Sequence, residues 1–355
     1  MMLTVKPDIA MMPQTHGNCR CFCFIGKNYL NCILDGFQTA AGRQWREHRG
    51  GMTEAGRQWR EDSGGKTIKN DRQMEKITLK YLRQRLLSRE NESHKHDYGR
   101  LLVVAGCETM PGAALLATGA ALRSGCGLVM LHSTPRTLFA AAANYPSAML
   151  SEDEGSHFST VPENMERYSA IAVGPGLGWS PSTMNAVMDL LTEACRRHIP
   201  AVIDADAINI LAVLPEWRGL IPPGSVLTPH KGELKRLLPA DSDDQRESLA
   251  MELCAATGCH IVMKGYHTRI FRPDGGVLVN TTGNPGMAKG GSGDVLTGLI
   301  GGLLARDYKA ADATALGVWI HGYAGDVLSA EKTMEAYDSQ DLISRLECGF
   351  KRLYL

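Results

Sequence analysis

The chain of 355 residues is long enough for one large domain or two small ones, and its 44% of hydrophobic residues can form a sizeable core. Its 38 basic and 38 acidic side chains cancel, so no overall field favours nucleic acid or an anionic membrane as a partner. No apolar run reaches the roughly 18 residues that span a bilayer, and the N-terminus lacks the layout of a signal peptide.

Residues 1–73 differ in composition from the rest of the chain. The stretch AGRQWRE occurs twice, at 41–47 and 55–61, within a segment rich in Gly, Arg, Gln and Asn. This composition is typical of disordered chain, and two polar copies are too few to build a solenoid. We expect residues 1–73 to be a disordered or non-native extension and residues 74–355 to form a single domain.

The ten cysteines are unevenly distributed. Cys19, Cys21 and Cys23 lie close to His16, but their spacing matches no tetrahedral zinc site. Six others are scattered singly from Cys107 to Cys348, as expected of small buried side chains in a reducing compartment. We therefore expect no firm protein metal site and a cytoplasmic location.

From residue 100 onward, short apolar runs alternate with helical patterns. Strands are expected within residues 100–106, 128–133, 169–178, 200–211, 224–238, 259–265, 268–273 and 276–280. Helices are expected at 111–125, at 181–197 and after the strands within 200–211 and 224–238. Two long helices at about 293–306 and 309–330 close the chain. This order predicts an α/β fold with a mostly parallel sheet covered by helices on both faces. The last two strands, joined at Asp-Gly, should form a hairpin at an edge.

Chemically informative motifs follow four of the expected strands. They are GPGLG (174–178), DAD (204–206), TPHKGE (228–233) and KG (264–265). In parallel sheets, ligands bind beyond the carboxyl ends of the strands. We therefore expect these motifs to surround one site.

The stretch TGNPGMAKGGSGDVLTGLIGGLL, residues 282–304, has six glycines in its first seventeen residues and then continues as an apolar helix. Gly290, Gly291 and Gly293 allow positive φ and a close approach of a ligand to the backbone. The start of a helix leaves N–H groups unpaired, which suits a phosphate group. No Gly-Lys-Ser/Thr closes the run, so it is not a P-loop, and it does not follow a first strand as a dinucleotide motif does.

Asp294 stands where the glycine run meets this helix. A carboxylate there can simply favour the helix dipole, an effect worth about 0.3–1 kcal/mol. It can also act as a general base that accepts the proton of a hydroxyl attacking a phosphoryl group. The local pattern leaves both interpretations open.

The stretch GNPGMAKGGSGDVLTG resembles the signature of the ADP/ATP-dependent NAD(P)H-hydrate dehydratases of the ribokinase-like superfamily. The likeness extends from residue 77 to about 350 and includes SHKHDYGRLLVVAG, MPGAALLA, GPGLG, DADAIN, LTPHKGE, MKG and HGYAGD. The KGGSGD sequence and the histidine of TPH are similar to the bacterial, ADP-dependent branch.

The resemblance implies ADP-dependent repair of NADHX or NADPHX, the hydrated forms of NADH and NADPH. The 6-hydroxyl of the S-epimer would be phosphorylated and phosphate then eliminated, giving NAD(P)H, AMP and phosphate. Mg²⁺ is expected with the ADP or ATP. The resemblance also implies a homo-oligomer, specifically a tetramer. It implies a separate epimerase acting upstream, because residues 1–73 are too short for an epimerase domain.

The resemblance also assigns roles to individual residues. Asp294 is the base. The anion hole comprises Gly290, Gly291, Ser292 and Gly293. The nucleotide-binding residues are Lys264, Gly265, Tyr266, His267, Thr268 and Gly293. The substrate-binding residues are Ala114, Gly176, His230 and Asp294.

Three further positions carry expectations. Glu233 stands where related sugar kinases hold magnesium through water, and Lys289 is expected to neutralise phosphate charge. His96 replaces a glycine that is usual in the family, and we expect it in a loop near the substrate entry. His321 and Asp326 are expected to pack or cap a helix.

Two other functions fit the same motifs. The protein could phosphorylate a vitamin-like alcohol and stop there, because fold and glycine run would be the same. It could instead be a non-catalytic nucleotide-binding protein, although retention of Asp294 with the full glycine run argues against this.

Overall fold

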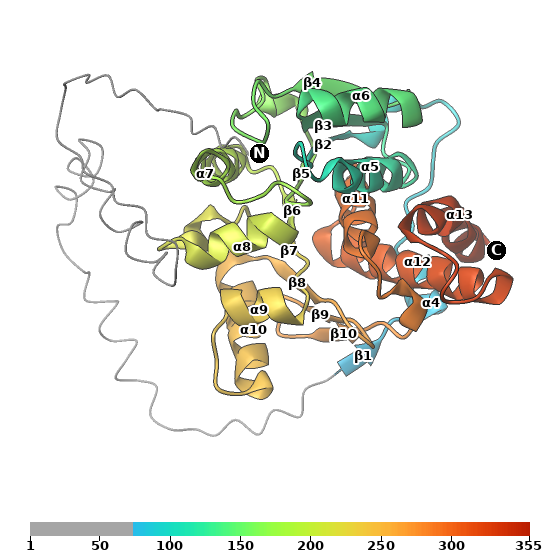
Figure 1. Cartoon of the computed structure of the whole chain (residues 1–355). Helices are drawn as coiled ribbons and strands as arrows, with labels where there is room; N and C mark the ends of the chain where they lie inside the picture. The colour runs from blue at the N-terminus through green and yellow to red at the C-terminus, as the bar shows by residue number, and fades with distance from the viewer. Residues whose placement is uncertain (1–73) are drawn as a thin grey trace, which may run out of the picture. The chain divides into compact units, whose positions relative to one another are not determined.

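The computed structural model describes residues 74–355, in which short apolar runs form one ten-stranded sheet (Figure 1). Its strands are β1 (Met74–Lys76), β2 (Arg100–Val104), β3 (Leu128–Ser133), β4 (Met149–Glu152), β5 (Ala170–Val173), β6 (Ala201–Ile203), β7 (Val226–Leu227), β8 (His260–Met263), β9 (Arg269–Phe271) and β10 (Val277–Val279). Their order across the sheet is β1-β10-β9-β8-β7-β6-β5-β2-β3-β4. The expectations placed on residues 1–73 lie outside the described residues.

The sheet is parallel from β8 to β4, as the alternation of strands and helices predicts. β9 pairs antiparallel with both β8 and β10, so the hairpin expected at Asp-Gly is confirmed. Its predicted place at the edge is wrong, because β1 pairs with β10 and forms the edge instead. β1 has only three residues, all exposed, and so carries no hydrophobic pattern.

Helices cover both faces of the sheet (Figure 1). They are α4 (Leu79–Arg83), α5 (Pro111–Leu122), α6 (Pro135–Asn144), α7 (Pro181–Arg197), α8 (Ala205–Val213), α9 (Lys231–Leu237), α10 (Asp243–Thr257), α11 (Ser292–Ala305), α12 (Ala310–Glu331) and α13 (Ser339–Tyr354). One core lies under α4–α6 and α11–α13, and a second lies under α7–α10. The predicted α/β architecture is confirmed.

Strand β2 shows why its sequence is continuously apolar. Leu101 and Val103 point into the first core, whereas Leu102 and Val104 point into the second. Successive side chains of a strand alternate between faces, so a strand covered on both sides needs apolar residues at every position.

The chain closes with three helices rather than the expected two, because α13 follows α12. α13 buries Leu342, Ile343, Leu346 and Leu353 against the first core and exposes its polar residues. Asp338 caps its start by accepting hydrogen bonds from the N–H groups of Gln340 and Asp341.

Small residues let α11 lie directly against α5. A methyl group added at Gly298 would lie 1.9 Å from the carbonyl oxygen of Ala117. This close approach fixes the position of α11, and with it the glycine run at its start.

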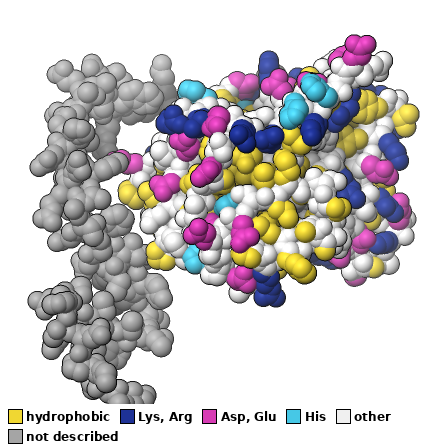
Figure 2. All heavy atoms as spheres, turned by 90° about the horizontal axis from the view of Figure 1, so that it is seen from above, with side chains coloured by type: hydrophobic (Ala, Val, Ile, Leu, Met, Phe, Trp, Pro, Cys, Tyr) yellow, Lys and Arg dark blue, Asp and Glu magenta, His cyan; other side chains and the backbone are white. Residues whose placement is uncertain are grey.

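The surface carries charges of both signs. On the face drawn in Figure 2, basic and acidic side chains are interspersed with apolar and neutral ones. Within residues 74–355, no helix combines the length and apolarity needed to cross a bilayer.

Candidate active site

A cavity of about 640 Å³ opens beyond the carboxyl ends of β6, β7 and β8. Its lining comes from the segment after β8, the glycine-rich loop before α11, and the first residues of α8, α9 and α11. Three of the four motifs expected to surround one site, DAD, TPHKGE and KG, contribute to this lining, whereas GPGLG does not. Asp294 and Lys264 both line the cavity.

The start of α11 presents unpaired backbone donors. Gly291 occupies the N-cap position with a φ of 88°, a conformation that favours glycine. Within residues 74–355, the N–H groups of Gly290, Gly291, Gly293 and Asp294 donate no hydrogen bond, and no side chain caps the helix. Ser292 N–H makes only a long contact of 3.4 Å to the Lys289 carbonyl. Of the four residues predicted to form an anion hole, Ser292 and Gly293 line the cavity, whereas Gly290 and Gly291 do not.

Asp294 lies in the first turn of α11, partly buried, and none of the hydrogen bonds within residues 74–355 reaches its carboxylate. Burial raises the pKa of Asp294 to about 7, and the negative charges of Asp204, Asp206 and Glu233 act in the same direction. The ammonium of Lys264 opposes them. A carboxyl group with this pKa can accept and release a proton near neutral pH.

Lys264 follows β8 and points its ammonium at Asp204. The distance from its Nζ to Oδ1 of Asp204 is 2.6 Å, and Glu233 Oε2 lies 3.9 Å away. Burial lowers the pKa of Lys264, but these two carboxylates outweigh it and raise the pKa above its usual value. Lys264 is therefore positively charged, and its ammonium lies next to the start of α11.

Gly293 is needed where Lys264 passes the start of α11. A methyl group at Gly293 would lie 3.2 Å from Lys264 Nζ and 3.7 Å from Asp204 Oδ2. The glycine leaves room for the ammonium between the helix and Asp204. The three residues form one compact unit at the cavity wall.

The predicted nucleotide segment, residues 264–268, lines the same cavity throughout. Tyr266 is 87% exposed, and its ring stacks on that of His267 with centroids 4.0 Å apart. His267 has a φ of 56°, and Thr268 Oγ1 donates to the Gly265 carbonyl. The segment is a tight turn that presents two stacked rings at the rim.

His230 forms the N-cap of α9 and lines the cavity, as its position in TPHKGE predicts. Its Nδ1 accepts hydrogen bonds from the N–H groups of Gly232 and Glu233, at 2.9 and 3.2 Å. The proton of the neutral ring is therefore on Nε2. Glu233 in turn accepts from the backbone N–H of His230 at 2.7 Å.

The other two predicted substrate residues, Gly176 and Ala114, do not line this cavity. Gly176 has a φ of 63° and lies on the same edge of the sheet, after β5. Ala114 is completely buried with its methyl group toward Gly106, so its side chain cannot contact a ligand. On α5 it is Ala113 that approaches Gly176.

Lys289, expected to neutralise phosphate charge, lines the cavity, but its ammonium is hydrogen-bonded within the chain. Its Nζ donates to the carbonyl groups of Met334 and Glu335, at 2.9 and 2.8 Å, and also to that of Tyr337. All three ammonium donors are used to hold the segment before α13. Lys289 therefore stabilises the wall of the cavity.

His321 contributes to the site, although the sequence indicated only a packing role. Its side chain lies on α12, lines the cavity and contacts Ser292 Oγ at 3.4 Å. Burial lowers the pKa of His321 to about 4, so the ring is neutral near pH 7. Asp326 fits its expected role, because it accepts from the Gly283 N–H at 3.0 Å and anchors the loop.

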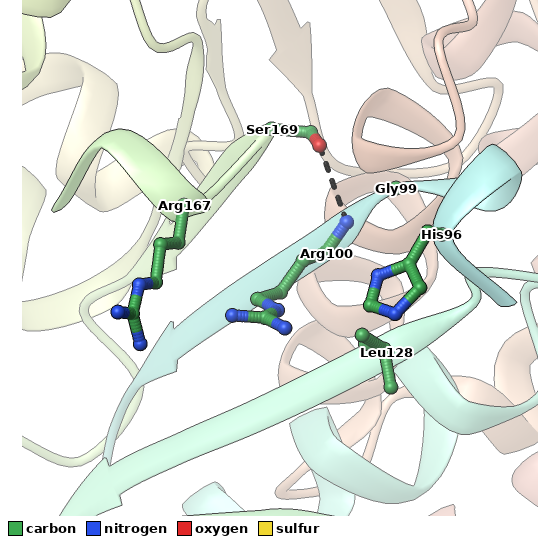
Figure 3. A pocket seen from close by; sticks show the side chains of 6 residues that line it. All are labelled: His96, Gly99, Arg100, Leu128, Arg167 and Ser169. Carbon is green, nitrogen blue, oxygen red and sulfur yellow. Dashed lines mark hydrogen bonds between the residues drawn. The ribbon is translucent and has the colours of Figure 1, made fainter. Parts of the chain in front are cut away.

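The expectation for His96 is wrong. His96 precedes β2, so it lies at the amino ends of the strands, on the opposite edge of the sheet from Asp294. There it borders a hollow of about 380 Å³ with Arg100 and Arg167 (Figure 3). Ser169 Oγ, which accepts from the Arg100 N–H at 3.2 Å, also lies there.

Sequence reasoning assigned no role to Asp204 or Asp206, although both belong to the DADAIN motif. Asp204 contacts Lys264, and Asp206 accepts from the Gly178 N–H and from Trp179 Nε1, at 2.8 and 3.0 Å. The sequence signal for these two residues is their position directly after a strand. Acidic residues at such a position also occur as helix caps.

No group of three or more His, Cys, Asp or Glu residues within 74–355 is arranged to hold a metal ion. Glu233, the expected water-mediated ligand, is 5% exposed and contacts His230 and Lys264. Glu233 is compatible with an ion carried by nucleotide phosphates, but the described residues do not supply a full set of protein ligands.

Comparison with known proteins shows extensive similarity. The ADP-dependent (S)-NAD(P)H-hydrate dehydratase of Neisseria meningitidis is 38% identical over 247 residues, covering 68% of this chain and 81% of the relative. The bifunctional NAD(P)H-hydrate repair enzyme of Moorella thermoacetica is 38% identical over 295 residues, covering 78% of this chain and 54% of the relative. The chain thus spans about half the length of the bifunctional relatives it matches.

Solved structures agree with this similarity. The ADP/ATP-dependent NAD(P)H-hydrate dehydratase of Bacillus subtilis, co-crystallised with ATP and Mg²⁺, has a TM-score of 0.68 and 33% identity, covering 79% of this chain and 98% of that one. A ribokinase-like superfamily protein of Enterococcus faecalis has the same TM-score at 28% identity, covering 79% and 96%. The fold is therefore ribokinase-like. The profile of the NAD(P)H-hydrate dehydratases matches residues 101–347, and the chain belongs to this family.

Proposed function

We propose that the protein is an ADP-dependent hydro-lyase that converts (6S)-NADHX and (6S)-NADPHX to NADH and NADPH. One observation carries the proposal: the unpaired amides of Gly293 and Asp294 share a cavity with the Asp294 carboxyl group, whose pKa is raised to about 7. Hydrogen-bond donors for a phosphoryl group, a base and a cation are thereby brought together. The names of the relatives supply the substrate class.

In the first step, Asp294 accepts the proton of the 6-hydroxyl, and the hydroxyl oxygen attacks the β-phosphate of ADP. The bond from phosphorus to the bridging oxygen breaks, and AMP leaves. The amides of residues 290–294 and the Lys264 ammonium stabilise the charge on the transferring group. Phosphoryl transfer depends mainly on such positioning and electrostatic stabilisation.

In the second step, the ring nitrogen lone pair expels phosphate from C6, and loss of a proton from the neighbouring ring carbon forms the double bond. Phosphate leaves far more readily than hydroxide, which explains why a nucleotide is consumed. The reduced nicotinamide, AMP and phosphate are the products.

Magnesium, when bound, would neutralise charge on the nucleotide phosphates. We propose that those phosphates hold it, with Glu233 reached through water. The rings of Tyr266 and His267 provide a surface on which the adenine could stack.

Hydrated NADH incubated with ADP and magnesium tests the proposal. The expected result is recovery of the absorbance of reduced nicotinamide, together with one AMP and one phosphate for each NADH formed. Recovery of a phosphorylated alcohol without dehydration would favour the small-molecule kinase. Binding of ADP without any product would favour the non-catalytic protein.

Domain organisation and assembly complete the proposal. We propose that residues 74–355 carry the activity, and that the protein works in the cytoplasm as a homotetramer with a separate epimerase upstream. A chain lacking residues 1–73 should keep its activity, and light scattering should give four times the chain mass. Purified R-hydrate should remain unconverted until an epimerase is added.

A further inference from the structure

We infer that Asp204 is a positioning residue of the proposed reaction, whose carboxylate fixes the Lys264 ammonium and the first turns of α11 relative to each other at the point of phosphoryl transfer. The inference rests on the proposed function and adds a residue that acts through its neighbours. Asp204 is only 1% exposed, which suits this indirect role better than contact with substrate.

The two carboxylate oxygens of Asp204 join two separate segments. Oδ1 accepts from Lys264 Nζ at 2.6 Å, and Oδ2 accepts from Thr297 Oγ1 at 2.7 Å. Lys264 lies at the end of β8, whereas Thr297 lies on α11, three residues after Asp294. One buried side chain therefore ties the nucleotide segment to the helix that carries the base and the anion hole.

The ordinary reason for an aspartate at this position does not apply. Asp204 is the N-cap residue of α8, where a carboxylate usually accepts from amides of the first turn. Here its side chain makes no capping hydrogen bond. The carboxylate is directed instead toward Lys264 and Thr297, at the wall of the cavity.

The backbone around Asp204 is equally constrained. Gly174, in the GPGLG motif, has a φ of 129°, and a methyl group there would lie 1.8 Å from the Asp204 carbonyl oxygen. The Asp204 N–H donates to the Val173 carbonyl at 3.0 Å. The end of β5 thus holds Asp204 in place while its side chain holds Lys264.

Asp204 also sets the charge around Asp294. The groups that affect the Asp294 carboxyl are Asp204 and Asp206 from α8 and its cap, Glu233 from α9, and Lys264 from the end of β8. His321, on α12, lines the same cavity as a neutral ring. Among the charged groups, Asp204 makes the largest contribution to the raised pKa of Asp294. Neutralising Asp204 should therefore lower that pKa.

The test compares Asp204→Asn with the wild type. Asparagine has the same shape and can still accept from Lys264, but it carries no charge. We expect kcat to fall by about tenfold or more and the acid limb of its pH profile to move down by about one unit. A purely structural role would lower the melting temperature and leave the acid limb in place. An unmoved acid limb with kcat within about twofold of the wild type would overturn the inference.

Asp153→Asn is the matched control. Asp153 is also a completely buried aspartate that follows a strand, but β4 lies four strands from β6 in the sheet. At about 4.8 Å per strand, this separation is about 19 Å. The control should lose stability without any movement of the acid limb. An equal movement in the control would contradict a specific role for Asp204.

Thr297 provides a second test if Asp204→Asn does not fold. Thr297→Val removes only the hydrogen bond to Asp204 Oδ2, whereas Thr297→Ser retains the hydroxyl. We expect valine to lower kcat by about threefold or more and serine to restore most of the loss. Valine and serine variants of equal activity would overturn the inference.

A measurement that does not depend on enzyme turnover distinguishes failure of the inference from failure of the proposed function. The carboxyl carbon of Asp294 can be titrated by ¹³C NMR, with Asp294→Asn used to assign its signal. Its pKa should fall in Asp204→Asn even if hydrated NADH proves not to be a substrate. An unchanged titration would overturn the inference, whereas inactivity of the wild type would overturn only the proposed function.

Discussion

Two aspartates, the completely buried Asp153 and the partly buried Asp294 at the start of α11, have opposite environments. Asp153, after β4, accepts hydrogen bonds from Ser159 N and Oγ, Thr160 N, Gly155 N and His132 Nε2, at 2.6–3.2 Å. Burial raises the pKa of Asp153, but these donors outweigh it and leave the pKa below its usual value. Asp294 has no such donors within residues 74–355, and its pKa rises to about 7.

The contrast separates an aspartate that stabilises the fold from an aspartate whose carboxylate is available to react. The Asp153 carboxylate accepts hydrogen bonds from all the donors named above, so it contributes to stability. Around Asp294 the amides and the carboxylate are left without partners, which costs stability and suits a ligand that supplies phosphate oxygens and a hydroxyl. The following predictions start from this contrast.

Removal of the base should have the largest effect. Asp294→Asn should reduce kcat by about 10²–10⁴-fold, the range expected for loss of a general base. Calorimetric affinity for ADP should stay nearly the same, because the amides and Lys264 remain. Steady-state kinetics and titration with ADP measure the two effects, and comparable turnover by the variant would remove Asp294 from the mechanism.

Filling the gap next to Lys264 should have the next largest effect. In Gly293→Ala, the new methyl group would lie 3.2 Å from Lys264 Nζ, and the ammonium must shift. We expect kcat to fall by about tenfold, because small misplacements in a phosphoryl-transfer site are costly. Gly219→Ala, where an added methyl group contacts nothing within 4 Å, is the control. Equal activity of the two variants would show that the spacing is unimportant.

The stability effects of the two aspartates should have opposite signs. The folded pKa of Asp153 is depressed, so its stabilisation is present above the unfolded pKa and is lost as pH falls. Asp153→Asn should therefore cost about 1–3 kcal/mol at neutral pH. The folded pKa of Asp294 is raised, so the folded state loses stability as pH rises from about 4 to about 7.

Asp294→Asn should accordingly be more stable than the wild type above about pH 7, by on the order of 1–2 kcal/mol after allowance for solvent screening. The difference should shrink as pH falls toward about 4. Urea denaturation at several pH values measures both variants. Destabilisation by Asp294→Asn at high pH would mean that the native carboxylate has partners.

The smallest effect is expected at the rim of the cavity. Tyr266→Ala should raise KM for ADP by about threefold to tenfold, the value of one stacking contact. Its kcat should stay the same, because Tyr266 is far more exposed than the reacting groups. A fall in kcat with unchanged KM would assign Tyr266 to the reacting groups instead of the adenine.

The sequence predicted the strands β2, β3 and β5–β10 and the helices α5, α7–α9, α11 and α12, because their hydrophobic patterns are regular. It missed the strands β1 and β4 and the helices α4, α6, α10 and α13. β1 is short and exposed, whereas the apolar positions of α13 do follow a helical period. Bounds at helix ends also shifted by a few residues, as for α5, which ends at Leu122.

Motif spacing placed most of the candidate site at one cavity, including Asp294, His230 and residues 264–268. It could not show that Asp204 joins Lys264 to Thr297, because these residues are 60 and 93 positions away from it. The hydrogen-bond partners of Lys289 were missed for a related reason, since a sequence does not show where a side chain points.

The pH dependence of kcat for hydrated NADH with saturating ADP tests the central claim most directly. We expect kcat to fall on the acid side of an apparent pKa near 7, because Asp294 must be deprotonated. Below that pKa, kcat should fall tenfold per pH unit. A rate that stays level down to about pH 5 would contradict it, because an ordinary carboxyl group with a pKa near 3.8 would then suffice.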